Sequence, residues 1–274
     1  MNDVFSVRRA LETSGLVPSD ARALLAHVLA CDRAWLIAHA NDAIERVAAD
    51  RFFALANRRR DGEPVAYLTG FREFYGLDLR VSPAVLIPRP ETETLVEAAL
   101  ERLPSDVPLR VLDIGTGSGA IALAIAHERP NAIVTATDVS SAALDLAQEN
   151  AQRLGLGNVE FIASDVYRDT PDVRFDAIVS NPPYIAAGDP HLASGDVRFE
   201  PRAALTPATD GLTLLRAIIA GARRRLDRGG SLVVEHGHDQ AEAVAALFVE
   251  AGFESLVSLR DLAGIPRVAA GRSP

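Results

Sequence analysis

Hydrophobic residues recur every three or four positions along the first sixty residues. The pattern is clearest over residues 21–30 and 44–60, and it is interrupted at residues 15–18 and around Asn41. Such spacing places hydrophobic side chains on one face of a helix. We therefore expect a small helical domain over residues 1–70.

The pattern changes to an alternation of hydrophobic and polar positions over residues 71–88, around Gly76 and Pro83. Alternation predicts strands with one buried face, and a glycine between two short strands is typical of a turn. We expect a β-hairpin that links the helical domain to the rest of the chain.

From residue 89 onward, hydrophobic runs of strand length alternate with amphipathic segments of helix length. Strands are expected at residues 109–115, 132–139, 159–164, 175–180 and 231–237, and helices at 120–129, 141–154, 212–226 and 241–252. Residues 254–272 are expected to add two strands. This alternation predicts an α/β domain over residues 89–274, with a mostly parallel sheet and helices on both faces. Ligands of this architecture bind at the carboxyl ends of the strands.

Composition and charge narrow the classes of function. The chain has 274 residues, a net charge of −9, a single cysteine (Cys31) and no lysine. One cysteine excludes an internal disulfide and a thiolate metal cluster, and the absence of lysine excludes Schiff-base chemistry on lysine. The basic runs at residues 58–60 and 223–225 lie near expected helix ends, where we expect solvated surface. Without a signal pattern or a membrane-spanning run, we expect a cytoplasmic protein.

The first strand of the α/β domain ends in a glycine-rich stretch, VLDIGTGSGAIALAIA, which contains Gly115, Gly117 and Gly119. Glycines at this point let the backbone turn tightly and approach a ligand closely. Gly115, Gly117 and Ala120 also satisfy the dinucleotide fingerprint, so the glycine spacing alone does not identify the ligand.

Two acids follow the next two expected strands. Asp138 comes roughly 20 residues after the glycine loop, where a carboxylate can accept hydrogen bonds from both ribose hydroxyls. Asp165 ends the third strand. These strand ends describe a nucleoside pocket, and both NAD and S-adenosylmethionine fit its outline.

The fourth strand ends in NPPY, residues 181–184. Its two prolines stop the strand and stiffen the turn. Asn181 offers a carbonyl oxygen that accepts hydrogen bonds, the backbone carbonyl of Pro182 offers a second acceptor, and Tyr184 can stack on a planar group. No acid–base group for hydride transfer accompanies them. We therefore expect transfer of a methyl group to a planar NH2 group, either an amide or the amine of a base.

Two other hypotheses remain open. One is a methyltransferase that acts on the amino groups of nucleic-acid bases, which would have to take a base out of its stack. The net negative charge of the chain argues against this hypothesis, because nucleic-acid binding normally needs a basic surface. The other is a non-catalytic binding module that retains the fold. The intact glycine loop, Asp138 and NPPY argue against such a loss of catalytic function.

Other polar residues carry weaker expectations. Glu91 and Glu93 resemble a carboxylate pair, but acids are also common at a helix start. His236 and His238 lack the spacing of a helical metal pair, and no metal site is expected. Arg198 and Glu200 in the stretch DVRFEP are expected to order a loop over the site or to contact its ligand.

The chain resembles the release factor glutamine methyltransferases, the HemK/PrmC family, over nearly its whole length. GFREFYG, LIPRPETE, VLDIGTGSGAIALA, IVSNPPYI, DPHLASGDVRFEPRAAL, DGL and VEHG occur in the order of that family. NPPY alone is shared with methyltransferases that act on base amines, whereas IPRPETE together with GDVRFEP and a helical N-terminal domain is specific. The resemblance implies a Rossmann-like class I S-adenosylmethionine-dependent methyltransferase domain with a seven-stranded sheet, preceded by a helical substrate-recognition domain.

The resemblance also implies the reaction and its residues. The donor would be S-adenosylmethionine, and the acceptor the glutamine of the Gly-Gly-Gln motif in bacterial peptide chain release factors, giving N5-methylglutamine. Family members commonly carry a tryptophan where Val166 stands. The implied substrate-binding residues are Asn181, Pro182, Pro183 and Tyr184, of which Asn181, Pro182 and Tyr184 are the catalytic candidates. The implied cofactor-binding residues are Gly115, Thr116, Gly117, Ser118 and Gly119 at the methionine end, Asp138 at the ribose, Asp165 and Val166 at the adenine, and Asn181. Neither direct nucleic-acid contact nor a membrane is expected.

Overall fold

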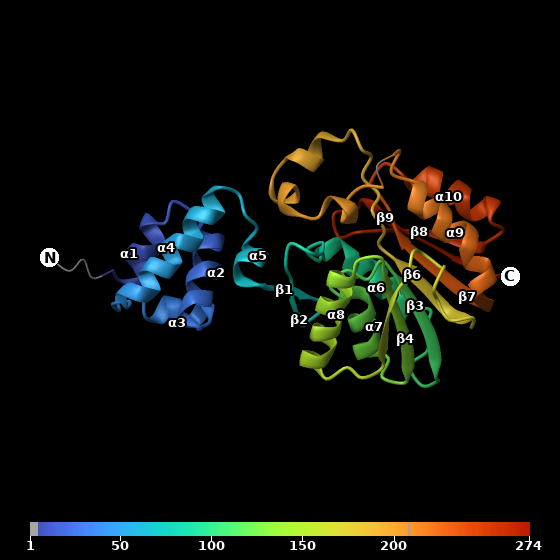
Figure 1. Cartoon of the computed structure of the whole chain (residues 1–274), viewed down its shortest axis with the longest axis horizontal. Helices are drawn as coiled ribbons and strands as arrows, with labels where there is room; N and C mark the ends of the chain where they lie inside the picture. Colours follow the sequence, from blue (N-terminus) through green and yellow to red (C-terminus); the bar gives the residue numbers. More distant parts are fainter. Residues whose placement is uncertain (1–4, 208) are drawn as a thin grey trace. The chain divides into compact units, whose positions relative to one another are not determined.

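The structure, a computed structural model, describes residues 5–207 and 209–274. It divides into two compact units (Figure 1). The first contains the described residues up to Phe71 together with Ala193–Phe199, and the second contains the described residues of Arg72–Leu192 and Glu200–Pro274. Within the described ranges, no helix is both long and apolar enough to span a bilayer.

The first unit is a bundle of short helices, as the hydrophobic pattern predicts. Its helices are α1 (Val7–Thr13), α2 (Pro18–Leu29), α3 (Arg33–Ala38), α4 (Arg46–Arg60) and α5 (Val65–Thr69). They enclose a core that includes the fully buried Leu24, Leu25 and Phe52. Ser6 and Asp32 cap α1 and α3 through their side chains, which satisfies backbone N–H groups that a helix start leaves free.

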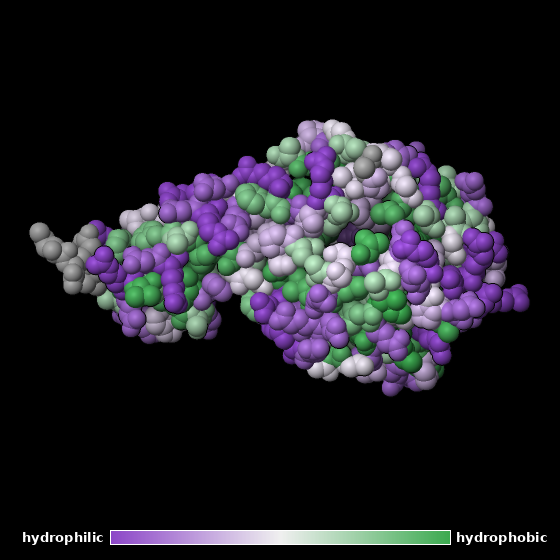
Figure 2. Space-filling view, in the orientation of Figure 1, coloured by the Kyte–Doolittle hydropathy of each residue, from purple (hydrophilic) through white to green (hydrophobic). Residues whose placement is uncertain are grey.

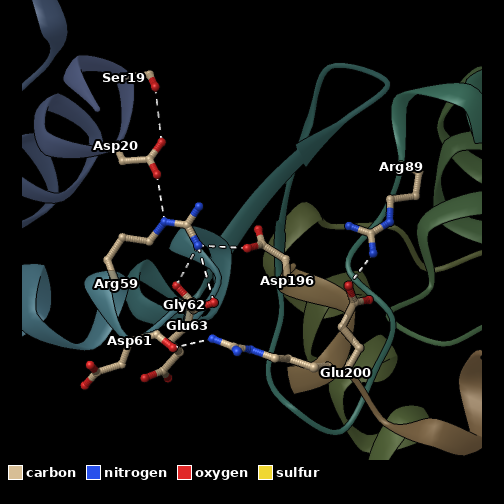
Figure 3. Close-up of polar contacts among 10 residues, drawn as sticks. Ser19, Asp20, Arg59, Asp61, Gly62, Glu63, Arg89, Asp196 and Glu200 are labelled. Atoms are coloured by element: carbon tan, nitrogen blue, oxygen red, sulfur yellow. Dashed lines mark hydrogen bonds and ion pairs between the residues drawn. The ribbon is translucent and has the colours of Figure 1, made fainter. Parts of the chain in front are cut away.

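The segment Ala193–Phe199 follows NPPY along the chain, yet it belongs to the helical unit. In Figure 3, Arg59 donates to Asp20 of α2 through Nε (2.7 Å) and to Asp196 through Nη1 (2.8 Å). Arg198 donates to the backbone carbonyl of Asp61. The expectation of a solvated arginine run is therefore wrong for Arg59, whose side chain is only 22% exposed and is shared by two carboxylates.

A two-stranded hairpin lies within the range 71–88 in which one is expected, and it ends at Arg80. It consists of β1 (Phe71–Phe74) and β2 (Leu77–Arg80). Tyr75 and Gly76 between them have φ angles of 51° and 74°. Two consecutive residues with positive φ form the tight turn whose twist matches that of the paired strands.

A seven-stranded sheet forms the second unit. In spatial order its strands are β5 (Val159–Ala163), β4 (Ala132–Asp138), β3 (Leu109–Ile114), β6 (Phe175–Ser180), β7 (Leu226–Glu235), β9 (Pro266–Arg272) and β8 (Glu254–Arg260). The first five run parallel, and β9 is antiparallel to both of its neighbours. This arrangement confirms the predicted mostly parallel sheet, although β7 begins at Leu226, earlier than the pattern indicates.

Helices cover both faces of the sheet (Figure 1). The covering helices are α6 (Glu93–Leu100), α7 (Ala120–Glu128), α8 (Ser141–Leu154), α9 (Thr213–Arg225) and α10 (Ala241–Glu250), and the short 3-10 turns are η1 (Pro90–Thr92), η2 (Pro190–Ala193), η3 (Asp196–Phe199) and η4 (Arg202–Ala204). Val111 of β3 packs into the core that holds α6 and α7, whereas Leu112 packs into the core that holds α9 and α10. Strands buried on both faces explain why the sequence shows continuous hydrophobic runs. Figure 2 shows hydrophilic side chains over the outer face of α8.

Candidate active site

The carboxyl ends of four neighbouring parallel strands surround one cavity of about 240 Å³. Parallel strands end at the same edge of a sheet, so residues that are distant in sequence meet there. The glycine loop follows β3, Asp138 ends β4, Asp165 follows β5, and Asn181 follows β6; all four line the cavity. The structure thus brings together the strand ends that the sequence singles out.

The glycine loop presents bare backbone to this cavity. Gly115 and Gly117 have φ angles of 74° and 57°, and a Cβ at either position would meet no atom within 4 Å. A cradle of this kind leaves room for a ligand to approach the backbone. Gly119 serves packing instead, because its Cβ would lie 2.9 Å from Leu123 and 3.2 Å from Ala147. Among the loop residues expected to bind cofactor, Gly119 does not line the cavity.

Asp138 is held rigidly at the end of β4. Its Oδ2 accepts from the backbone N–H of Gly117 (3.0 Å), and its Oδ1 accepts from that of Ser140 (2.9 Å). A carboxylate has about four acceptor positions, so each oxygen keeps one for a further hydrogen bond. Asp138 is therefore oriented by the protein and still able to accept from two ligand hydroxyls.

The buried carboxylate of Asp113, near the end of β3, bonds to the glycine loop through Thr116. It is fully buried, and this burial raises the pKa of its carboxyl to about 7. The Thr116 hydroxyl donates to Asp113 Oδ2 at 2.7 Å and stabilises the ionised form, which lowers the pKa in turn. This contact fixes the turn that carries Gly115 and Gly117.

The next strand end supplies Asp165 and Val166. Asp165 is exposed, and its Oδ2 lies 3.8 Å from Nη1 of Arg168. Val166 lines the cavity with a φ of 54°, a left-handed conformation that costs a β-branched residue about 1–3 kcal/mol. The half-buried Val166 side chain packs against the core of α9 and α10, which compensates for this strain.

Asn181 follows β6 and lines the cavity. Its Nδ2 donates to the Thr92 hydroxyl at 3.1 Å. Among the described residues, Asn181 Oδ1 makes no hydrogen bond, so an acceptor is left free. Asn181, Pro182 and Pro183 all line the cavity, together with Thr92.

Tyr184 lies outside the cavity lining. Its hydroxyl donates to Glu235 Oε1 at 3.0 Å, and its backbone carbonyl accepts from Nε2 of Gln240 at 2.9 Å. Burial, reinforced by the charge of Glu235, raises the pKa of Tyr184. These contacts hold the NPPY turn against β7, whereas stacking of Tyr184 on a substrate stays a prediction.

Gly211 lets another loop come close to the same turn. With a φ of 83°, its Cβ would lie 2.3 Å from the Tyr184 carbonyl oxygen and 2.7 Å from Nε2 of Gln240. We expect Gly211→Ala to displace the turn, lowering both the melting temperature and the rate of any reaction at this site. Gly264→Ala is the matched control, because Gly264 has a φ of 78° but nothing within 4 Å of its Cβ.

In the control, the free energy of unfolding should fall only by the cost of placing alanine in the left-handed conformation, about 1–2 kcal/mol. Urea unfolding of both variants measures the difference. An equal loss in the two variants would contradict the close contact at Gly211.

Sequence reasoning gives no role to two polar residues of the site, and a third, Glu200, has the ordering contacts that were one of its two expected roles. Thr92 and Glu235, buried at 4% and 2% exposure, flank Asn181 and Tyr184. Glu200, whose side chain is fully buried, pairs with Arg89 of the cavity lining (Figure 3). Glu200 also accepts from the Ile87 N–H at 3.1 Å. Glu200 therefore orders the segment that carries Arg89. Because Glu200 arises more than a hundred positions later in the chain, no local signal reveals this contact.

The remaining candidates have structural surroundings. Glu93 accepts from the Tyr75 N–H at 3.1 Å, while Glu91 is exposed. Their carboxylates thus play different parts, and only Glu93 anchors the hairpin. His236 is buried with Nδ1 at 2.8 Å from the Gly237 carbonyl oxygen, whereas the side chain of His238 is exposed.

Comparison with known proteins identifies the family of the chain. Residues 92–196 match the methyltransferase small domain family, and residues 6–70 match the PrmC N-terminal domain family. A release factor glutamine methyltransferase of Burkholderia pseudomallei is 52% identical over 270 residues, covering 96% of this chain and 95% of that protein. The Escherichia coli protein of the same name is 47% identical over 262 residues, covering 96% and 94%.

Among solved structures, a methyltransferase from Pyrococcus furiosus aligns with a TM-score of 0.56 and 20% identity, covering 80% of this chain and 98% of that one. This likeness concerns the fold alone. The near full-length identity to the named relatives goes further: this chain belongs to the release factor glutamine methyltransferase family.

Proposed function

We propose that this chain transfers a methyl group from S-adenosylmethionine to the side-chain amide nitrogen of the glutamine in the Gly-Gly-Gln motif of bacterial peptide chain release factors. The observation that carries the proposal is the cavity in which a bare glycine loop and Asp138 face Asn181, whose acceptor oxygen is free. Relatives of about half identity over nearly the full chain carry the corresponding name.

The residues that line the cavity match the chemical groups of the methyl donor. Open backbone at Gly115 and Gly117 fits the methionine end, and the two remaining acceptor positions of Asp138 fit the ribose hydroxyls. Asp165 and Val166 at the next strand end would flank the adenine. When bound, S-adenosylmethionine supplies an electrophilic sulfonium methyl group.

The protein's task is then mainly alignment. An amide nitrogen is a weak nucleophile, because its lone pair is delocalised into the carbonyl group. Asn181 Oδ1 and the Pro182 carbonyl would hold the NH2 group, and orientation of this kind is worth about 7–11 kcal/mol in favourable cases. The same acceptors stabilise the positive charge that develops on nitrogen as the methyl arrives. The surplus proton leaves to solvent afterwards.

We infer a division of labour along the chain. Residues 1–70 would recognise the release factor, residues 71–88 would link the two domains, and residues 89–274 would carry out the methyl transfer. The match of residues 6–70 to the PrmC N-terminal domain supports the first part. A release factor substrate would place the protein in the cytoplasm.

The substrate class is tested by a competition experiment. The protein is incubated with labelled S-adenosylmethionine, an unmodified bacterial release factor and an equal mass of ribosomal RNA and DNA fragments. We expect label in the release factor fraction only. Label in nucleic acid instead would keep the chemistry but overturn the proposed substrate, and label in neither fraction would overturn both.

A further inference from the structure

The cavity has one positively charged side chain in its lining. Among the described residues that line it, Arg89 is the only one with a cationic side chain, and Asp138 and Asp165 are the only acids. The proposed donor carries a carboxylate and an ammonium group at its methionine end. Removing a carboxylate from water is costly unless a cation or hydrogen-bond donors pair with it. The site therefore has to supply a partner for this carboxylate.

The glycine loop is poorly suited to be that partner, because three of its successive N–H groups already donate within the protein. The N–H groups of Gly115 and Thr116 both donate to the Thr137 carbonyl, at 2.8 and 2.9 Å. The N–H of Gly117 donates to Asp138 at 3.0 Å. A backbone whose donors are occupied still offers carbonyl oxygens, which suit an ammonium group but repel a carboxylate.

Arg89 belongs to the end of the cavity where the glycine loop and Asn181 meet. It immediately precedes η1, and the N–H of Thr92 in that turn donates to the Arg89 carbonyl at 3.1 Å. The Thr92 hydroxyl accepts from Asn181, which follows β6. Strand β6 is the neighbour of β3, which carries the glycine loop, whereas β4 and β5 with Asp138 and Asp165 lie on the other side of β3. The cation is thus separated from the two acids that would flank the ribose and the adenine.

Glu200 holds the guanidinium group of Arg89 in place. Arg89 Nη2 donates to Glu200 Oε1 (Figure 3). Glu200 Oε2 accepts from the Ile87 N–H at 3.1 Å, and the Glu200 side chain is fully buried. A guanidinium has five N–H donors in one plane, and the described residues accept from only one of them. The Arg89 side chain, which is 33% exposed, therefore keeps donors in the fork geometry that suits both oxygens of a carboxylate.

We propose that Arg89 binds the carboxylate of S-adenosylmethionine, with Glu200 as the positioning residue that fixes its guanidinium group. This role deepens the proposed function and rests on S-adenosylmethionine being the methyl donor. Together with Asp138 for the ribose, Arg89 would hold the donor at both sides of the glycine loop. Loss of the arginine should therefore weaken binding only of those ligands that carry the carboxylate.

Calorimetry with two ligands tests this assignment. S-adenosylmethionine and decarboxylated S-adenosylmethionine share the adenosine, the sulfonium and the amine, and differ only in the carboxylate. We expect the wild-type protein to bind the first about 10- to 100-fold more tightly, the range of a hydrogen bond between charged groups. In Arg89→Met this preference should disappear, because affinity for S-adenosylmethionine is lost while affinity for the decarboxylated ligand is kept. Arg89→Lys keeps the charge without the fork and should retain part of the preference.

Arg267→Met is the matched control. Arg267 is 21% exposed and pairs through Nε with Asp261 at 3.0 Å, and the Asp261 side chain is 4% exposed. Neither residue lines the cavity. Breaking this ion pair removes a comparable contact, so both ligands should bind Arg267→Met as they bind the wild type.

The same titrations show which results contradict the assignment. Equal affinity of the wild type for the two ligands would overturn it without any variant. A wild-type preference in Arg89→Met would mean that the carboxylate is bound elsewhere. A parallel loss of both ligands in Arg89→Met would reduce Arg89 to a structural partner of Glu200.

These outcomes are distinct from a failure of the proposed function. If the wild type binds neither ligand, the proposed donor is wrong, and the role of Arg89 fails with it. If the preference disappears in Arg89→Met but no release factor is methylated, Arg89 keeps its role and only the proposed substrate is refuted.

Discussion

Replacing Asn181 by alanine is expected to lower the rate of methyl transfer by about 10²- to 10³-fold, the usual cost of one lost preorganised hydrogen-bonding group. The side chain supplies the acceptor oxygen at the cavity, and alanine leaves only the Pro182 carbonyl to hold the substrate NH2 group. Because Asn181 does not pair with Asp138 or the glycine loop, the Kd for S-adenosylmethionine should change by only a few-fold.

Single-turnover kinetics with saturating donor, together with calorimetric Kd values, measure both quantities in one set of samples. Asn131→Ala is the control, because Asn131 is exposed at the start of β4, away from the cavity. If Asn181→Ala loses donor affinity as strongly as rate, Asn181 serves the cofactor and not the substrate amide.

Replacing Asp138 by alanine is expected to act in the opposite sense, weakening donor binding by about 10²-fold or more. Each hydrogen bond to a charged group contributes about 1.5–3 kcal/mol, and Asp138 has two acceptor positions to offer. The substitution also frees the N–H groups of Gly117 and Ser140, which loosens the loop.

Titration calorimetry with S-adenosylmethionine measures this loss. Asp138→Asn keeps an acceptor for one of the two backbone N–H groups, and its result shows how much of the effect comes from loop order. Asp145→Ala, an exposed aspartate of α8, is the control for charge. Unchanged donor affinity in Asp138→Ala would remove Asp138 from the ribose site.

The strands and helices of the second unit could be predicted from the sequence because burial on both faces leaves continuous hydrophobic runs. The candidate residues at the ends of β3, β4, β5 and β6 follow from the same reasoning, since parallel strands end together. The structure brings Asp138, Asp165 and Asn181 to one cavity as expected, and it leaves Gly119 and Tyr184 outside its lining.

What sequence reasoning misses is the support of the site. Thr92 bonds to Asn181 and Glu235 bonds to Tyr184, in each case between segments far apart in the chain. The motifs that contain these two residues, LIPRPETE and VEHG, do not by themselves give either one a role. Likewise, Asp196 joins the helical unit through the buried side of Arg59, whose run of arginines indicates only solvated surface. The left-handed φ of Val166 is equally invisible, because β-branched residues rarely adopt it.

Tandem mass spectrometry of a release factor after incubation with this protein and S-adenosylmethionine tests the central claim most directly. The account predicts a single added methyl group on the side-chain nitrogen of the Gly-Gly-Gln glutamine, and none when Asn181→Ala replaces the wild-type protein. A methyl group on another residue of the release factor, or an equal yield from Asn181→Ala, would contradict the assignment of this cavity as a clamp for one glutamine amide.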